Sequence, residues 1–275
     1  MAPDDRKLAA LSPGGRVQRL SSVAMAVRLL KAFSQDEAEI GVTAMAKRLG
    51  VAKSTVYRLA TTLVLEGMLE QNPETERYRL GLALFGLGAL VRQRMNVSTE
   101  GRPHLFELRA ATNETVHLAI LEGSEIMYVL NLESNQAIRM RADLGSRKPA
   151  FCTAEGLAML AFQPEESVAA VIRAGFEPRT PRTLVDPARW RAELVEVRRR
   201  GYAIEDEQSE QGMRSIAAPI RDSTRRVVAS VGLAGPVQRL SDEAVLRFVP
   251  LITGAAATIS TRLGCPSRAG VHAPY

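Results

Sequence analysis

Apolar residues recur three and four positions apart through most of the first third of the chain, which is the spacing of one helix face. The pattern predicts three short helices, over residues 22–33, 43–49 and 53–66. Thr43 stands where a side chain would cap the second helix. Gly50 follows that helix, at a position where a left-handed residue would end it. The chain is therefore expected to begin with a three-helix unit.

Two short extended runs follow the third helix, at residues 68–71 and 77–80. The polar segment 72–76 between them is typical of a hairpin tip. Three helices followed by a hairpin predict a winged helix-turn-helix domain over residues 20–81. Residues 82–98, rich in Leu and Gly, predict a linker helix whose exposed apolar side suits a subunit contact.

Beyond residue 98 the pattern changes to mixed helix and strand, which predicts a second domain over residues 99–264. Helices are expected at 100–112, 153–161, 165–174, 187–200 and 241–263. Strands are expected at 115–121, 125–132, 137–141, 203–206, 215–220 and 227–233. Residues 1–19 and 265–275 are expected to be disordered tails. The fold class is therefore expected to be α+β, with an N-terminal winged helix and a C-terminal α/β domain.

Composition is compatible with two folded domains, because 46% of the 275 residues are hydrophobic and 24% are charged. The net charge is +6, and residues 1–98 carry 14 Lys and Arg against 9 Asp and Glu. This excess favours a polyanion as the partner of the first third. No apolar run has the roughly 18 residues of a membrane span and no signal peptide is recognised, so a cytoplasmic protein without membrane contact is expected. Cys152 and Cys265 form no C-x-x-C pair, so neither a disulfide nor a metal site is expected, and no cofactor is expected.

The third helix has a polar side opposite its apolar face, and this side carries no acidic residue before Glu66. Arg58 can place two donors on a guanine, and Thr55 can contact a base edge or a thymine methyl group. Lys53, Ser54 and the helix N-terminus can hold phosphates. The expected DNA-binding residues are Lys53, Ser54, Thr55, Tyr57, Arg58 and Thr61, with Arg77 and Arg79 of the hairpin on the backbone or in the minor groove.

Several ordered motifs resemble the IclR family of bacterial transcription regulators over residues 20–263. In the first domain they are the run Gly50–Leu59 and the run Tyr78–Gly81. In the second they are Glu114–Ala119, Gly145–Pro149, Gly201–Ala203 and Gly212–Pro219. The resemblance implies a homodimer or a dimer of dimers that binds a palindromic double-stranded DNA operator. It also implies an effector pocket on a sheet with GAF-like topology, and it matches Lys53, Thr55 and Arg58 to family residues that contact DNA.

By position, the resemblance places the effector site at Met140, Ala154, Glu155, Glu205, Met213, Ser215, Gly232 and Ala234. Gly232 and Ala234 stand where several members have hydroxyls, which predicts a roomier, more apolar pocket and a bulky, weakly polar or aromatic effector. Glu155 lies near the expected anion site and would repel a carboxylate unless it points away. Each of these residues also has a purely structural interpretation, with Met140 and Met213 as core residues.

Two other function classes stay open from the sequence. A catalytic second domain is disfavoured because G-x-S-x-G, P-loop and H-E-x-x-H motifs are absent, and because no base is identifiable near Cys152. His117 falls in an expected strand and is interpreted as an interior group with satisfied hydrogen bonds. A protein-interaction adaptor built on the winged helix is the third class, and it leaves the basic face from Lys53 to Arg58 unexplained.

Overall fold

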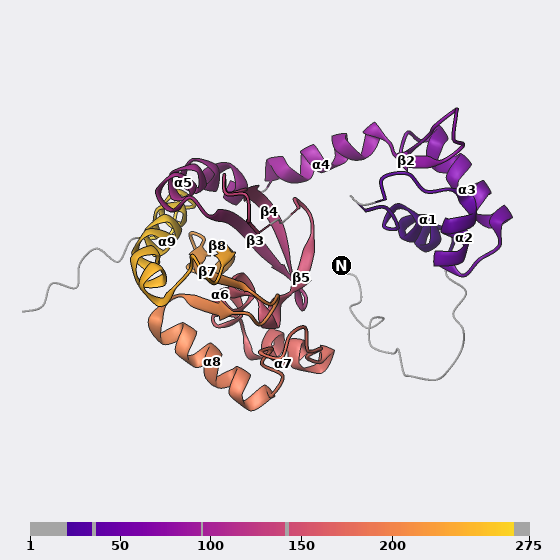
Figure 1. The fold of residues 1–275 in the computed structure, drawn as a ribbon. Helices are drawn as coiled ribbons and strands as arrows, with labels where there is room; N and C mark the ends of the chain where they lie inside the picture. Colours follow the sequence, from indigo (N-terminus) through magenta and orange to yellow (C-terminus); the bar gives the residue numbers. More distant parts are fainter. Residues whose placement is uncertain (1–20, 35–36, 95, 141–142, 267–275) are drawn as a thin grey trace, which may run out of the picture. The chain divides into compact units, whose positions relative to one another are not determined.

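The computed structural model describes residues 21–34, 37–94, 96–140 and 143–266 (Figure 1). The chain divides into two units, residues 1–93 and 94–275. The first unit has one hydrophobic core and the second has two, one on each face of its sheet.

The N-terminal unit is a winged helix-turn-helix followed by a fourth helix. Its elements are α1 (Ser22–Leu30), α2 (Val42–Leu49), α3 (Lys53–Leu65), β1 (Leu69–Gln71), β2 (Tyr78–Leu80) and α4 (Leu82–Arg94). Strands β1 and β2 pair antiparallel, and Ile40 extends the hairpin by exchanging two backbone hydrogen bonds with Tyr78. Leu29, Met45 and Val56 bring one face of each of the three helices into the core. The expected arrangement of three helices and a hairpin is confirmed.

The ends of the first two helices differ in part from expectation. Gly50 has φ 66° and ψ 35° and its N–H donates to Ala46, so it ends α2 as a left-handed residue, as expected. Thr43 does not cap α2, because the helix already begins at Val42 and its N-cap is Gly41. No side-chain hydrogen bond caps the helix at Gly41. Helix α1 ends at Leu30, three residues before the expected end.

The C-terminal unit is a six-stranded antiparallel sheet with helices on both faces. Its helices are α5 (Asn96–Thr112), α6 (Ala154–Leu160), α7 (Glu165–Ala174), α8 (Pro187–Arg200) and α9 (Asp242–Arg262), with a 3₁₀ turn η1 (Ala150–Cys152). Its strands are β3 (Thr115–Glu122), β4 (Glu125–Leu132), β5 (Arg147–Pro149), β6 (Ala203–Asp206), β7 (Met213–Arg221) and β8 (Val227–Pro236), in the order β5-β4-β3-β8-β7-β6. Helix α6 packs on one face, and α5 and α9 pack on the other (Figure 1).

The expected strand at 137–141 is wrong in its described part, because residues 137–140 form a loop and 141 lies outside the described residues. The Thr115 hydroxyl donates to the carbonyl oxygen of Met140 at 3.0 Å and accepts from the N–H of Ser134 at 3.1 Å. These bonds tie the loop to the end of β3 instead of letting it pair as a strand. The short strand β5, which the pattern did not predict, pairs with β4.

Two boundaries of the C-terminal unit also differ. Helix α5 begins at Asn96, four residues earlier than expected. Cys265 was expected in a disordered tail, yet its N–H donates to Ser260 at 2.9 Å, so the ordered chain continues past α9. The rest of that tail from residue 267, and residues 1–19, lie outside the described residues. By length and composition α9 could cross a membrane, and its inner side packs on β7 and α5.

Candidate DNA-binding face and effector site

Helix α3 presents the expected polar side to solvent. Val56 and Ala60 are buried in the core of the N-terminal unit. The opposite side is exposed at Lys53, Ser54, Tyr57, Arg58 and Thr61, and Thr55 is half-buried beside them. The face is therefore open to a ligand and combines two cations with hydroxyl groups.

The N-terminus of α3 has no side-chain cap. Its N-cap is Ala52, which cannot accept a hydrogen bond through its side chain. The first N–H groups of a helix need an external acceptor, and the helix dipole makes that acceptor preferably anionic. Ala52, Lys53 and Ser54 are all exposed, so a DNA phosphate can reach these N–H groups.

Thr61 is placed on the expected face, but its hydroxyl proton is already used. Its Oγ1 donates to the carbonyl oxygen of Tyr57 at 2.9 Å, and Thr62 makes the same bond to Arg58 at 3.0 Å. Thr61 can therefore offer DNA an acceptor and a methyl group without breaking a bond within the helix.

The hairpin places Arg77 and Arg79 on its exposed surface, with different freedom. Arg79 lies opposite Glu70 in the β1–β2 register, and its guanidinium contacts the Glu70 carboxylate at 2.8 and 2.9 Å. Glu39 adds a second carboxylate at 4.0 Å. The hairpin of β1 and β2 is the wing of this domain. The charge of Arg79 on the wing is therefore partly neutralised by Glu70 before it meets DNA.

The expected effector residues of the sheet share one face, under α6. Pairing aligns Glu205, Ser215, Ala234 and Thr115 across four strands, and Gly232 lies in the neighbouring row opposite His117. Met213 lies on the same face two residues before Ser215. Ala154 and Glu155 approach from the first turn of α6 and are buried. Met140, in contrast, lies on the loop beyond the sheet, so it does not form the expected strand wall.

Glu205 is buried and accepts three hydrogen bonds from groups inside the protein. Its Oε1 accepts from the N–H groups of Gln208 and Ser209 at 2.5 and 2.9 Å, and its Oε2 accepts from the Ser215 hydroxyl at 2.8 Å. Burial and, to a smaller extent, the charge of Glu155 raise the pKa of Glu205 to about 7, against the lowering effect of these bonds. Glu205 thus anchors the loop that follows β6.

Glu155 fills the space that the absence of a side chain at Gly232 opens. A Cβ placed on Gly232 would lie 2.7 Å from the Cδ of Glu155, and closer still to its Oε1. The expectation of a roomier, more apolar pocket at Gly232 is therefore wrong, because a carboxylate from α6 occupies the position. The side chain points toward the sheet.

His117 is buried, but its hydrogen bonds are not satisfied. Its Nδ1 lies 3.2 Å from Glu155 Oε1, without hydrogen-bond geometry. Within the described residues, both ring nitrogens of His117, Oε1 of Glu155 and Oγ of Ser230 are buried without a hydrogen-bond partner. The interpretation of His117 as a satisfied interior group is thus wrong.

Burial and neighbouring acids shift the pKa values of Tyr128 and Cys152 in this region. Burial, followed by the charges of Glu155 and Glu205, raises the pKa of the Tyr128 phenol well above its ordinary value. Burial raises the pKa of the Cys152 thiol to about 12, so this cysteine stays protonated and is a poor nucleophile. Among the described residues no His, Cys, Asp and Glu side chains group as metal ligands do.

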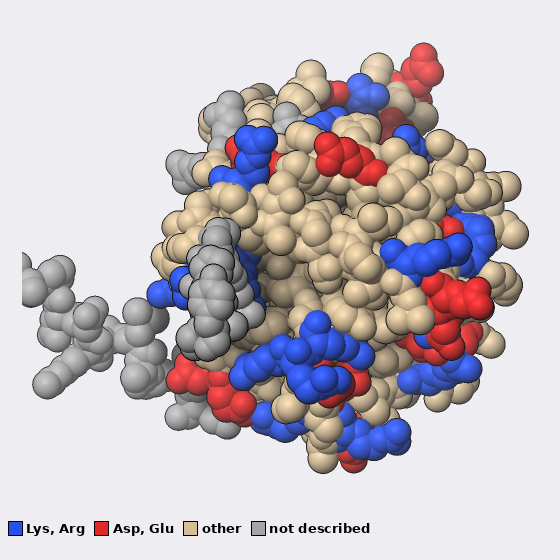
Figure 2. All heavy atoms as spheres, turned by 90° about the vertical axis from the view of Figure 1, so that its left-hand side faces the viewer, with Lys and Arg blue, Asp and Glu red and all other residues tan. Residues whose placement is uncertain are grey.

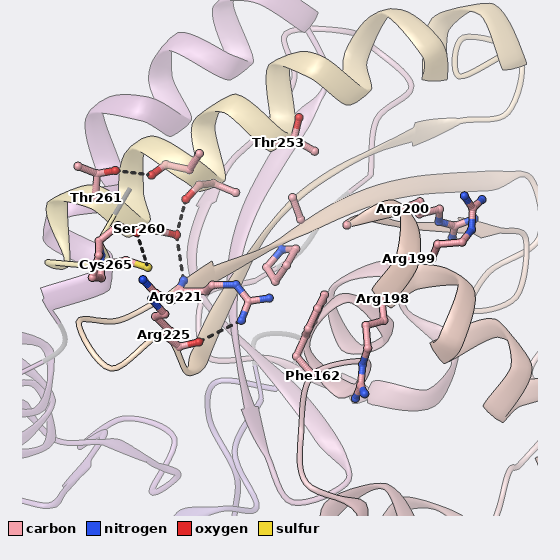
Figure 3. Close-up of a pocket in the computed structure, with 16 residues that line it drawn as sticks. Phe162, Arg198, Arg199, Arg200, Arg221, Arg225, Thr253, Ser260, Thr261 and Cys265 are labelled. Carbon is pink, nitrogen blue, oxygen red and sulfur yellow. Dashed lines mark hydrogen bonds between the residues drawn. The ribbon is translucent and has the colours of Figure 1, made fainter. Parts of the chain in front are cut away.

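A separate hollow of about 660 Å³ lies among the ends of α8, β7 and α9 (Figure 3). Figure 2 shows basic side chains bordering a recessed, mostly uncharged surface. The lining includes Arg198, Arg199, Arg200, Arg221 and Arg225, and no acidic residue among those described.

Several of these arginines are already engaged. Arg199 and Arg200 contact Glu196 and Glu193, and Arg221 lies 4.4 Å over the Phe162 ring. Sequence reasoning missed this hollow because its residues come from separate elements. The only signal in the sequence is the run of three arginines at 198–200.

Comparison with known proteins identifies the family of this chain. The profile described as "Bacterial transcriptional regulator IclR C-terminal" matches residues 89–261, and the "IclR helix-turn-helix domain" matches residues 22–73. The chain belongs to the IclR family. It is therefore a helix-turn-helix transcription regulator, as the sequence predicts.

Relatives in the IclR family support the same assignment along nearly the whole chain. The HTH-type transcriptional regulator XynR of Escherichia coli is 32% identical over 90% of this chain and 99% of its own length. The crystal structure of a putative IclR regulator from Silicibacter sp. TM1040 is 33% identical, covers 90% of this chain and 98% of its own, and has a TM-score of 0.78. An IclR homologue from Microbacterium hydrocarbonoxydans, crystallised with 4-hydroxybenzoate, is 27% identical, covers 88% and 99%, and has a TM-score of 0.81.

Proposed function

We propose that this IclR-family regulator binds a double-stranded DNA operator through α3, and that a small organic effector held under α6 changes the strength of that binding. The observation that carries the proposal is the exposed side of α3, where Lys53 and Arg58 stand among hydroxyl groups beside an uncapped helix N-terminus. Operator binding by the intact protein is expected to take place in the cytoplasm.

Each residue of the α3 face has a distinct proposed role. Arg58 reads a base edge, and Thr55 and Tyr57 contact bases or sugars beside it. Lys53 and Ser54 hold phosphates together with the helix N-terminus. Thr61 accepts a hydrogen bond from the DNA or packs its methyl group against the wall of the groove. Arg77 and Arg79 of the wing contact the DNA backbone or the minor groove.

We further propose that the protein works as a homodimer or a dimer of dimers. Leu82, Phe85 and Leu90 on α4 are 78, 75 and 57% exposed, which is unusual for large apolar side chains on one helix. Covering them with α4 of a second copy would bury this surface and set two recognition helices at a defined spacing. Two half-sites about 34 Å apart, or a multiple of this, would match such a dimer.

The effector acts only if it binds the two arrangements of the DNA-binding heads with different affinity. Its site is proposed at Met140, Ala154, Glu155, Glu205, Met213, Ser215, Gly232 and Ala234. An aromatic effector is proposed because the relative from Microbacterium hydrocarbonoxydans was crystallised with 4-hydroxybenzoate. Neither a cofactor nor a catalytic residue forms part of the proposal.

A gel-shift assay with the DNA that flanks the protein's own gene tests the regulator function. We expect a shifted band that weakens as salt rises, because phosphate contacts release counterions. Absence of a shift even at low salt would contradict DNA binding and favour the adaptor function.

A further inference from the structure

The face under α6 contains buried polar atoms that make no hydrogen bond within the described residues, although His117 Nδ1 and Glu155 Oε1 lie 3.2 Å apart. They are the two ring nitrogens of His117 on β3, Oε1 of Glu155 on α6 and Oγ of Ser230 on β8. All three side chains are at most 2% exposed. Buried polar groups are nearly always hydrogen-bonded. Several buried polar atoms without a hydrogen bond on one face therefore indicate a place where another molecule supplies the missing bonds.

The position of Glu155 is built into the fold. Its carboxyl group lies over Gly232, in space that any side chain at that position would occupy. Glu205, on the same face, is the second buried acid, and its raised pKa reflects burial and the charge of Glu155. The proposed effector site thus contains two buried acids.

We infer that Glu155 determines the chemical class of the effector, which presents a hydroxyl or an amine to this residue instead of a carboxylate. The inference rests on the proposed effector site. Glu155 Oε1 makes no hydrogen bond in the structure, so it can accept one from a ligand donor, which an ionised carboxylate does not have. A ligand carboxylate would also place a like charge beside a buried acid, where low polarity strengthens repulsion. A hydroxyl can donate to Glu155 and accept from His117 at the same time.

Three aromatic probes that differ in one polar group test the inference: benzyl alcohol, benzylamine and benzoate. Calorimetric titration of the full chain should show that the alcohol or the amine binds at least about tenfold more tightly than benzoate. Glu155→Gln keeps the shape of the side chain and removes its charge, so the preference over benzoate should fall by about tenfold. Glu155→Ala should bind benzoate more tightly than the wild type does.

Glu165→Gln is the matched control, because Glu165 is an exposed acid on α7. It should leave all three affinities unchanged. The inference is overturned if the wild type binds benzoate as tightly as the other probes, if Glu155→Gln leaves the preference intact, or if no probe binds.

Gel shifts with the same preparations separate this inference from the proposed function. Normal operator binding together with any overturning titration would refute only the role of Glu155. A lost gel shift would refute the regulator function, whatever the probes show.

Discussion

Replacing Gly232 with Ala should destabilise the C-terminal unit through one identifiable collision. The added methyl group would lie 2.7 Å from Cδ of Glu155, in a region where both residues are buried. Glu155 cannot give way freely, because it is on the first turn of α6 and faces His117 on β3. Overpacking of this kind costs about 1–3 kcal/mol of unfolding free energy.

A double-mutant cycle identifies the cause of that cost. In a Glu155→Ala background the colliding carboxyl group is absent, so the further change Gly232→Ala should be tolerated. The two changes should therefore be non-additive, with an interaction energy of about 0.5–3 kcal/mol. Gly254→Ala is the control in the same unit, because a Cβ there meets nothing within 4 Å, and it should stabilise α9 by about 0.5–1 kcal/mol.

Urea unfolding followed by tryptophan fluorescence measures these energies in the relevant unit. Trp190 is the only tryptophan of the chain, is fully buried, and donates from Nε1 to the Phe151 carbonyl oxygen at 2.9 Å. Its emission therefore reports on the core between α6 and α8. A Gly232→Ala cost below about 0.5 kcal/mol, or an additive cycle, would refute the placement of Glu155 over Gly232.

Three further predictions concern DNA binding, pH dependence and assembly. Arg58→Ala should cost about 1–3 kcal/mol of binding free energy at a cognate base pair and relax the specificity there. Lys53→Ala should instead weaken binding to all DNA sequences and flatten its salt dependence. Unaltered specificity of the Arg58 variant in a binding-site selection would contradict the role of Arg58. The pKa of Glu205 is about 7 in the folded protein and 4.5 in an unfolded chain, so the folded state binds the proton more tightly. The contribution of Glu205 to stability is therefore full below pH 4.5 and is lost as the pH rises to 7. Between these pH values the wild type should lose up to about 3 kcal/mol more than Glu205→Gln in urea unfolding, and equal slopes would show that Glu205 titrates normally. Phe85→Glu should shift the protein toward monomer in analytical ultracentrifugation, and an unchanged mass would exclude α4 as the subunit contact.

Features that depend on local spacing could be predicted from the residues alone. Helix periodicity identified α3 and its polar side, because successive side chains on a helix are separated by a constant angle. Gly50 was recognisable as the end of α2, since only its own backbone conformation decides that role. The order of helices, hairpin and mixed α/β elements was enough to predict the fold class and, with the motifs, the family.

The effects of residues on partners distant in the chain became apparent from the packing of the elements. From the sequence, the absence of a side chain at Gly232 predicts an empty space beside the sheet. In the structure, α6 places the carboxyl group of Glu155 in that space. Residues 137–140 resemble a strand, yet the Thr115 hydroxyl holds them as a loop. Arg79 looks free for DNA until the hairpin register sets Glu70 opposite it. Periodicity describes which side of an element is buried, whereas contacts between elements depend on packing in three dimensions, which local spacing does not contain.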